Sequence, residues 1–162
     1  DLAEKYGCQI IRTAVGEANV TDAMIQRQAV FGGEGSGGPI DPRVGYVRDS
    51  FVGMALILNA MAEHQKSISQ IVSELPSYAI FKTKVELDRE QIDKTFTALD
   101  NHFADAQISR LDGLRMDWPD KWLLVRASNT EPIVRLIAEA PADIEAKQLC
   151  EQARKIIALT TN

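Results

Sequence analysis

The chain has 162 residues, of which 45% are apolar and 25% are charged, the composition of a folded globular protein. Its net charge of −5 argues against a general nucleic-acid binder, which would carry a basic stripe. No apolar run approaches the roughly 20 residues that a membrane span requires. We therefore expect neither nucleic acid nor a membrane as a partner, and the length allows one ordinary domain or two small ones.

The first half of the chain has the pattern of an α/β layer. Residues 8–15 are predicted to form a strand, and Thr21 or Asp22 is expected to begin a short helix. Two further helices are predicted to begin after the caps Asp49 and Ser67. We expect the apolar stripes of these two helices to be buried; they comprise Phe51, Met54, Ala55, Leu58, Met61 and Ala62, and then Ile68, Ile71, Val72 and Leu75.

Pro76 and Ser77 interrupt the second of these helices, which predicts a domain boundary there. Residues 1–76 are then expected to form an α/β unit, and residues 77–162 are expected to form a second unit of a different kind. The second unit combines helices with short strand-like runs that are separated by turn signals, which is typical of a small α+β domain. Its strands are predicted at residues 78–87, 108–111, 114–118, 121–126 and 133–140.

Two helices are predicted in the second unit. Asp88, with Gln91 three residues later, resembles a capping box that opens the first, and Asp143 is expected to cap the second. Their apolar stripes are Ile92, Phe96, Leu99 and Phe103, and then Leu149, Cys150, Ala153, Ile156 and Ile157.

The cysteines and histidines do not indicate a metal site. Cys8 and Cys150 lie far apart without CxxC spacing, so we expect two reduced, packed cysteines in a cytoplasmic protein. His64 and His102 each lie in a predicted helix without a second His or Cys at ligand spacing. A structural or solvated role is expected for both.

The most glycine-dense stretch, residues 32–38, matches G-x-G-x-x-G but does not predict a dinucleotide site. That fingerprint needs a strand before the loop and a helix opening at it, whereas no strand is expected before this loop and two prolines follow it. No Gly-Lys-Ser/Thr of a Walker loop follows either. The loop carries Glu34 and Ser36, whose acceptors and hydroxyl suit the paired hydroxyls of a sugar. The alternative is a plain glycine-rich connection.

A second polar loop, residues 126–132, joins two predicted strands. It offers a guanidinium, two hydroxyls, an amide and backbone N–H groups from Arg126, Ser128, Asn129 and Thr130. This set fits a phosphate, because an arginine can bind two oxygens while small donors bind the third. The alternative is a turn capped by its own side chains. Arg135 reaches the same place if its strand lies beside the loop, and is otherwise a solvated strand residue.

With these two loops, the chain resembles the α-D-phosphohexomutase family of phosphoglucomutases and phosphomannomutases over essentially its whole length. The second loop is the most specific of the shared motifs. The motifs are Thr13-Ala14-Val15-Gly16, Gly32-Gly33-Glu34-Gly35-Ser36-Gly37-Gly38, Leu75-Pro76, Asp112-Gly113-Leu114-Arg115 and Arg126-Ala127-Ser128-Asn129-Thr130-Glu131-Pro132.

The resemblance implies a C-terminal fragment: the latter part of a third α/β domain, then a complete fourth domain with an antiparallel sheet and two helices, similar to the TATA-binding protein. It implies interconversion of hexose 1-phosphate and hexose 6-phosphate, with glucose or mannose favoured, through a phosphoserine and a hexose 1,6-bisphosphate. The family's Thr-Ala-Ser-His-Asn-Pro and Asp-Gly-Asp-Gly-Asp motifs do not occur here. We therefore expect the catalytic serine and the Mg²⁺ site in missing N-terminal domains of the same polypeptide.

By the same resemblance, Glu34 and Ser36 hold sugar hydroxyls of a phosphosugar substrate. The non-reacting phosphate is held by Arg126, Ser128, Asn129 and Thr130. Many family members carry Met or Gln at the position of Gly35 and His at the position of Gly38. A sugar contact made by that His is therefore missing here. Two alternatives remain: a phosphoglucosamine mutase, which Asn129 disfavours, and a non-catalytic module that binds sugar phosphates.

Overall fold

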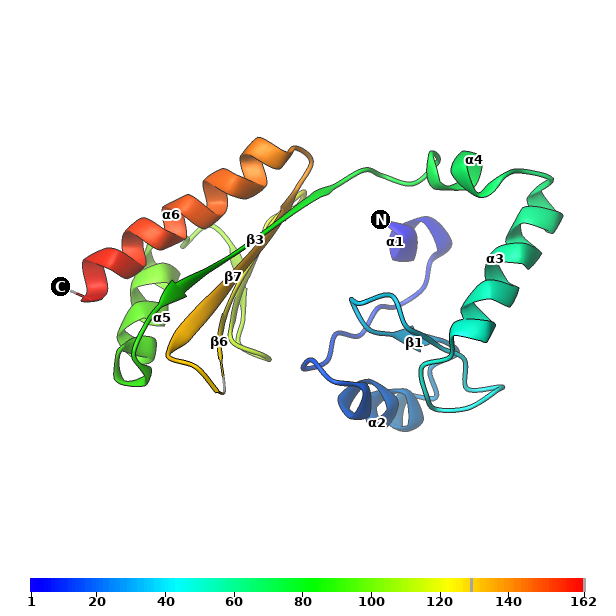
Figure 1. Ribbon diagram of the computed structural model, residues 1–162, viewed down its shortest axis with the longest axis horizontal. Coiled ribbons are helices and arrows are strands. Elements are labelled where there is room, and N and C mark those ends of the chain that lie inside the picture. The colour runs from blue at the N-terminus through cyan, green and yellow to red at the C-terminus, as the bar shows by residue number, and fades with distance from the viewer. Residues whose placement is uncertain (129, 162) are drawn as a thin grey trace. The chain divides into compact units, whose positions relative to one another are not determined.

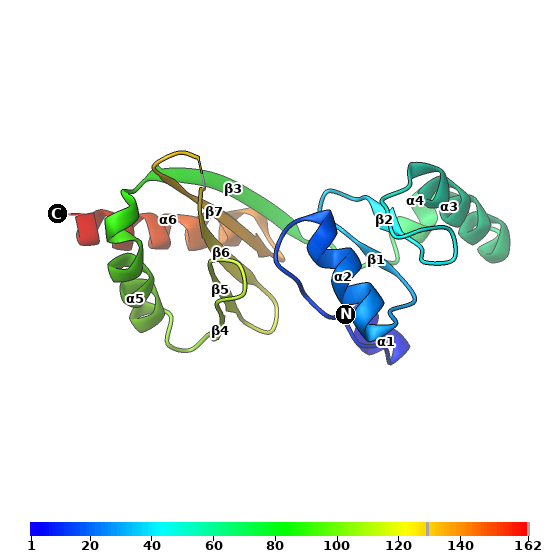
Figure 2. The same ribbon diagram turned by 90° about the horizontal axis from the view of Figure 1, so that it is seen from below.

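The computed structural model describes residues 1–128 and 130–161. They form two compact units, Asp1–Pro76 and Ser77–Asn162, whose helices and strands are shown in Figures 1 and 2. No helix in the described part of the chain is long and apolar enough to cross a membrane.

Unit 1 (Asp1–Pro76) consists of four helices and one very short hairpin. The predicted strand at residues 8–15 is wrong: this segment pairs with no described strand, and an extended segment without a hydrogen-bonded neighbour is not part of a sheet. The next helix begins at Glu17, earlier than expected, after Gly16 with its φ of 131°. The elements are α1 (Leu2–Tyr6), α2 (Glu17–Arg27), β1 (Gly32–Gly33), β2 (Pro39–Ile40), α3 (Ser50–His64) and α4 (Ile68–Val72).

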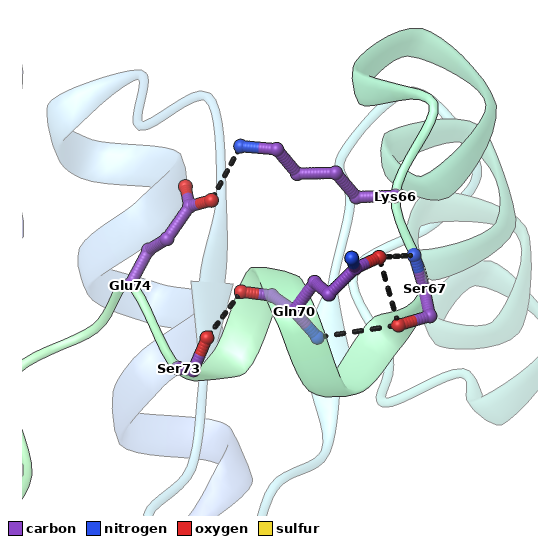
Figure 3. Close-up of polar contacts among 5 residues, drawn as sticks. All are labelled: Lys66, Ser67, Gln70, Ser73 and Glu74. Atoms are coloured by element: carbon purple, nitrogen blue, oxygen red, sulfur yellow. Dashed lines mark hydrogen bonds and ion pairs between the residues drawn. The ribbon is translucent and has the colours of Figure 1, made fainter.

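The caps of α3 and α4 are those that the sequence predicts. The carboxylate of Asp49 accepts hydrogen bonds from the backbone N–H groups of Phe51 (2.8 Å) and Val52 (3.2 Å). At α4 the Ser67 hydroxyl accepts from the N–H of Gln70 at 3.3 Å, while the Gln70 side chain accepts from the N–H of Ser67 at 2.8 Å (Figure 3). This reciprocal pair is a complete capping box.

The apolar stripes of α3 and α4, in contrast, are not buried as predicted. Phe51, Met54 and Leu58 are 81%, 58% and 64% exposed, and neither helix contains a buried residue. The periodicity is present, but no described element of unit 1 packs over this face. The buried side chains of unit 1 are those of Met24, Ile40 and Asp41.

Unit 2 (Ser77–Asn162) is a five-stranded antiparallel sheet with two helices, as predicted. The strand order is β3-β7-β6-β5-β4, so that the first strand of the unit pairs with the last along its whole length. Its elements are β3 (Ala79–Glu86), the 3₁₀ turn η1 (Arg89–Gln91), α5 (Ile92–His102), β4 (Gln107–Ser109), β5 (Leu114–Asp117), β6 (Trp122–Ala127), β7 (Ile133–Ala140) and α6 (Asp143–Thr161).

Helices α5 and α6 cover one face of this sheet (Figure 1). Alternate strand residues point into the core, as the period of two requires, and the predicted helix stripes meet them. The buried Thr95 and Thr160 hydroxyls join the two helices at 2.9 Å. The core comprises Leu87, Phe96, Leu99, Phe103, Leu114, Met116, Leu123, Val125, Val134, Leu136, Ala138, Ala140, Ala146, Leu149, Cys150, Ala153 and Ile157.

Two smaller predictions are corrected. Asp88 precedes the 3₁₀ turn η1 and its side chain makes no capping hydrogen bond, and α5 begins only at Ile92. Cys8 is exposed rather than packed. Cys150 is buried as expected, and burial raises the pKa of its thiol to about 11.

Candidate functional site

The glycine-rich segment forms the tip of a hairpin in unit 1. Gly32 pairs with Ile40 and Gly33 with Pro39, so strands enter and leave the loop, contrary to the expectation that no strand precedes it. The N–H of Gly37, whose φ is 91°, donates to the carbonyl of Glu34 at 2.9 Å. No helix opens at the loop, which therefore lacks the geometry of a dinucleotide-binding turn.

Both predicted sugar-binding residues lie at this tip. Ser36 is exposed, whereas the Glu34 side chain is only 17% exposed. No basic residue stands next to Glu34 in the sequence, but in the fold Arg48 Nη1 lies 2.7 Å from Glu34 Oε2. Sequence reasoning missed Arg48, because the chain brings it back to the hairpin only by way of the irregular segment 41–48.

Arg48 also pairs with Glu17 at the start of α2, with 2.6 Å between Arg48 Nε and Glu17 Oε2. This hydrogen bond holds the pKa of Glu17 below its ordinary value of 4.5. The same bond, followed by the charge of Glu34, raises the pKa of Arg48. The hairpin tip is therefore an ion-paired cluster and not a free glycine-rich connection.

The second predicted loop lies between β6 and β7 in unit 2. Its ends are joined by a hydrogen bond from the N–H of Ser128 to the carbonyl of Ile133 at 2.9 Å. The Ser128 hydroxyl accepts from the N–H groups of Thr130 (3.4 Å) and Glu131 (3.3 Å), and it lies 3.5 Å from the Thr130 hydroxyl. The self-capped turn therefore exists, and it brings the two hydroxyls together. Asn129 lies outside the described residues.

Arg126, the third predicted member, is turned toward the preceding turn of the sheet. Its Nε lies 3.2 Å from Asp112 Oδ1, and its side chain is 30% exposed. Gly113 makes this approach possible: its φ is 87°, and a Cβ there would lie 2.5 Å from the Val125 carbonyl oxygen. A guanidinium has five N–H donors, so one contact through Nε leaves its terminal nitrogens for an anion.

Three cationic residues on neighbouring strands form a row on the face of the sheet opposite the helices. Arg126 on β6 is directly opposite Arg135 on β7, and Arg135 is directly opposite Lys84 on β3. Residues opposite each other in a ladder point to the same face, and like charges placed so destabilise a sheet. This register places the strand of Arg135 beside the loop, which is the condition under which Arg135 was expected to reach a phosphate bound there. Lys84 was not singled out from the sequence. The alternation of its strand shows which face of the sheet Lys84 lies on, but not which strand is its neighbour.

Lys84 also lines an open groove of about 530 Å³ beside the loop. The groove includes the carboxylates of Glu86, Asp88 and Glu131, which oppose an anion inside it. The carboxylates therefore make the groove itself unfavourable for an anion, whereas the Arg126 and Arg135 part of the row lies on the two strands that flank the loop of Ser128 and Thr130. No group of three or more His, Cys, Asp or Glu in the described part of the chain is placed to hold a metal ion.

Fold and site together define a two-unit chain, an α/β unit with a polar hairpin followed by an α+β unit with a cationic, hydroxyl-rich loop. Two family models match it: the phosphoglucomutase/phosphomannomutase alpha/beta/alpha domain III at residues 1–78, and the C-terminal domain of the same proteins at residues 83–156. The chain belongs to the phosphoglucomutase/phosphomannomutase family.

Curated relatives and a solved structure agree with this assignment. The chain is 36% identical to a phosphoglucomutase/phosphomannomutase of Thermococcus kodakarensis and 30% identical to a probable phosphoglucosamine mutase of Methanopyrus kandleri. Each match covers 97% of this chain but 35% of the relative. A family protein of Burkholderia thailandensis superimposes with a TM-score of 0.79 at 25% identity, over 98% of this chain and 34% of that one.

Proposed function

We propose that this chain supplies sugar and phosphate recognition to a phosphohexomutase that interconverts hexose 1-phosphate and hexose 6-phosphate. Glucose and mannose phosphates are the favoured substrates. The reaction runs through a phosphoserine and a hexose 1,6-bisphosphate, both dependent on N-terminal domains of the same polypeptide. A cytoplasmic location is part of this proposal.

The observation that carries the proposal is the Arg126–Arg135 pair beside the loop of Ser128 and Thr130. Arg126 and Arg135 are paired across the strand ladder, and like charges at paired positions destabilise a sheet, so an oxyanion that accepts hydrogen bonds from both would remove that cost. The Ser128 oxygen accepts two N–H groups, so its own proton can be donated either to the Thr130 hydroxyl, 3.5 Å away, or to an anion. Asn129 adds an amide to the same loop in the sequence.

At the hairpin, Glu34 accepts hydrogen bonds from sugar hydroxyls, and the Ser36 hydroxyl both accepts from them and donates to them. Arg48 occupies Oε2 of Glu34, which leaves Oε1 as the acceptor. Neither loop carries out a bond-breaking step. Both hold the substrate in place, and positioning supplies much of the rate enhancement of phosphoryl transfer.

Mg²⁺ belongs to the proposal only through the rest of the polypeptide. The described residues offer no cluster of carboxylates that fits the ion, so no step of this chain is assigned to it. Each loop, taken by itself, offers partners for groups that a hexose 1,6-bisphosphate carries: the loop of Ser128 and Thr130 offers donors for a phosphate, and the hairpin offers Glu34 and Ser36 for sugar hydroxyls.

Titration of the chain with inorganic phosphate tests the anion site. We expect a dissociation constant of about 1 mM, since a single oxyanion makes few contacts. Arg126→Ala and Arg135→Ala should each weaken binding about tenfold. Arg154→Ala removes one equally charged side chain from α6 and should leave binding unchanged. Equal weakening by all three substitutions would show that only net charge matters, and the site assignment would then be wrong.

Assays of the complete polypeptide test the reaction. With Mg²⁺ and a hexose bisphosphate present, we expect turnover of glucose 1-phosphate or mannose 1-phosphate, and no turnover by residues 1–162 alone. Phosphoglucosamine mutase is the second candidate, because relatives with that name match at 30% identity. A higher kcat/KM with glucosamine 1-phosphate would select it. If the complete polypeptide binds hexose phosphates without turnover, the chain belongs to a non-catalytic binding module.

A further inference from the structure

The side chain of Arg48 crosses the hairpin directly over Gly38. A Cβ at position 38 would lie 2.5 Å from Cδ of Arg48, closer than real Cβ contacts, and 3.0 Å from Cγ, which is tighter than most of them. Gly38 does not have the positive φ that would itself require glycine. A side chain at position 38 would therefore collide with Arg48, whereas the backbone conformation there does not itself require glycine.

Beyond Gly38, the Arg48 guanidinium ends in two ion pairs on different elements. Nη1 contacts Glu34 Oε2 at 2.7 Å, and Nε contacts Glu17 Oε2 at 2.6 Å. The backbone on either side of Arg48 is fixed as well. Its own N–H donates to Glu17 Oε1 at 3.3 Å, and the next N–H, of Asp49, donates to the Pro39 carbonyl at 3.0 Å. The arginine thus joins α2, the hairpin and the start of α3.

This arrangement determines what Glu34 can do. A glutamate on a glycine-rich loop has many rotamers, and ordering it on binding would weaken the bond that it makes. Here Arg48 holds one carboxylate oxygen, and the side chain is already largely covered. The second oxygen is the one left to accept a hydrogen bond from a ligand.

We propose that Arg48 is the positioning residue of the sugar loop: it passes over the bare Cα of Gly38 to hold Glu34 in one rotamer, with Oε1 presented to sugar hydroxyls. The inference rests on the proposed sugar-binding role of Glu34. It assigns Arg48 no contact with the reacting atoms. It also gives a reason for Gly38 that concerns this chain alone: the glycine and the arginine form one unit.

Kinetics of the complete polypeptide test whether Arg48 acts through Glu34. Arg48→Ala should lower kcat/KM for the hexose phosphate about tenfold or more, and Arg48→Lys should restore part of the loss. In a Glu34→Ala background, Arg48→Ala should cause no further loss, because its target is gone. Multiplicative losses, or wild-type kinetics for Arg48→Ala, would overturn the proposal.

Gly38→Ala tests the crossing. It should displace Arg48 and reduce kcat/KM about as much as Arg48→Ala does, and the double variant should be no worse than either single one. Gly45→Ala is the matched control: its Cβ would meet only Val47 Cγ1, at an ordinary 3.8 Å, and it has no positive φ. If Gly38→Ala behaves like Gly45→Ala, Arg48 does not occupy the space over position 38.

Hydrogen exchange separates this inference from the proposed function. In residues 1–162, both Arg48→Ala and Gly38→Ala should raise the exchange rates of the Glu34 and Gly37 N–H groups, which bond across the loop. If the complete wild-type polypeptide has no mutase activity, the proposed function fails, but faster exchange still shows that Arg48 orders the loop. Unchanged exchange in both variants overturns the inference whatever the activity.

Discussion

The two units differ most in what their apolar residues contact. In unit 2 the strand alternation and the two helix stripes meet in one core, and Leu114, Leu123 and Leu136 are completely buried. In unit 1 the stripe of α3 is as regular in sequence, yet Phe51 and Leu58 remain mostly exposed. An amphipathic pattern thus identifies a face, but burial requires a second layer that packs against it.

In unit 1, local interactions compensate in part for the small amount of buried apolar surface. Capping side chains hold the starts of α3 and α4, and ion pairs of Arg48 and of Lys66 with Glu74 join separate segments. Such interactions contribute little each when exposed, whereas buried apolar area contributes in proportion to its size. Unit 2 should therefore be the more stable unit of residues 1–162.

The same substitution made in both units tests this comparison with the largest expected effect. Leu136→Ala removes a completely buried side chain and should cost about 2–5 kcal/mol of unfolding free energy. Leu58→Ala removes a side chain that is 64% exposed and should change stability by less than about 0.5 kcal/mol. Urea unfolding followed by tryptophan fluorescence measures the first variant, because Trp118 and Trp122 lie in unit 2, and helical circular dichroism measures the second, because α3 is a helix of unit 1. Equal shifts for the two variants would mean that α3 is packed.

A glycine pair sharpens the comparison with a smaller effect. Gly113 and Gly7 both have positive φ, but a Cβ at Gly113 would meet the Val125 carbonyl while a Cβ at Gly7 would meet nothing. Gly113→Ala should cost about 1–3 kcal/mol and lower the urea midpoint of tryptophan fluorescence. Gly7→Ala should cost about 1 kcal/mol, limited to the end of α1, and leave that midpoint unchanged. A normal midpoint in Gly113→Ala would show that the Asp112–Gly113 turn can move away from β6.

Lowering the pH should destabilise unit 1 more than unit 2, and this is the smallest of the three expected effects. Hydrogen bonds to arginine or lysine lower the pKa of Glu17, Asp41 and Glu74, all in unit 1, and Asp41 falls to about 2 beside Arg43. Groups whose pKa is lowered on folding stabilise above their ordinary values of 4.5 and 3.8, and that stabilisation is lost as the pH falls toward 2.

We therefore expect helical circular dichroism to decrease between pH 4.5 and 2 while tryptophan emission remains native. Arg43→Ala should make this decrease begin at higher pH, because Asp41 loses its partner. Arg154→Ala in unit 2 is the control and should leave the profile unchanged. A simultaneous loss of both signals would contradict separate acid responses.

The sequence predicted unit 2 well because its signals are local or periodic. The alternation of Leu123 and Val125, the stripe from Phe96 to Phe103 and the Asp112–Gly113 turn each specify an element without knowledge of its partner. The segment 8–15 shows the limit: β-branched and apolar residues give strand propensity, but a strand exists only when another strand pairs with it. For the same reason, the burial of the α3 stripe was predicted wrongly.

For the candidate sites, the sequence indicated residue types but not their pairings. Glu34 and Arg126 stand out as charged residues in polar loops, and both prove to be engaged, with Arg48 and Asp112. Neither partner could be assigned, because one returns through an irregular segment and the other through a turn. The opposition of Arg126, Arg135 and Lys84 depends on strand order, which no single-strand pattern contains.

The pairing of β3 with β7 has a consequence for how unit 2 is made. β3 leaves the ribosome first among the five strands, but its partner is the last strand to be synthesised. Until β7 emerges, β3 has no ladder to join, and closing the long intervening loop makes this a slow, non-local step. During that interval Lys82 and Lys84 keep the unpaired edge charged, which discourages pairing with other nascent chains.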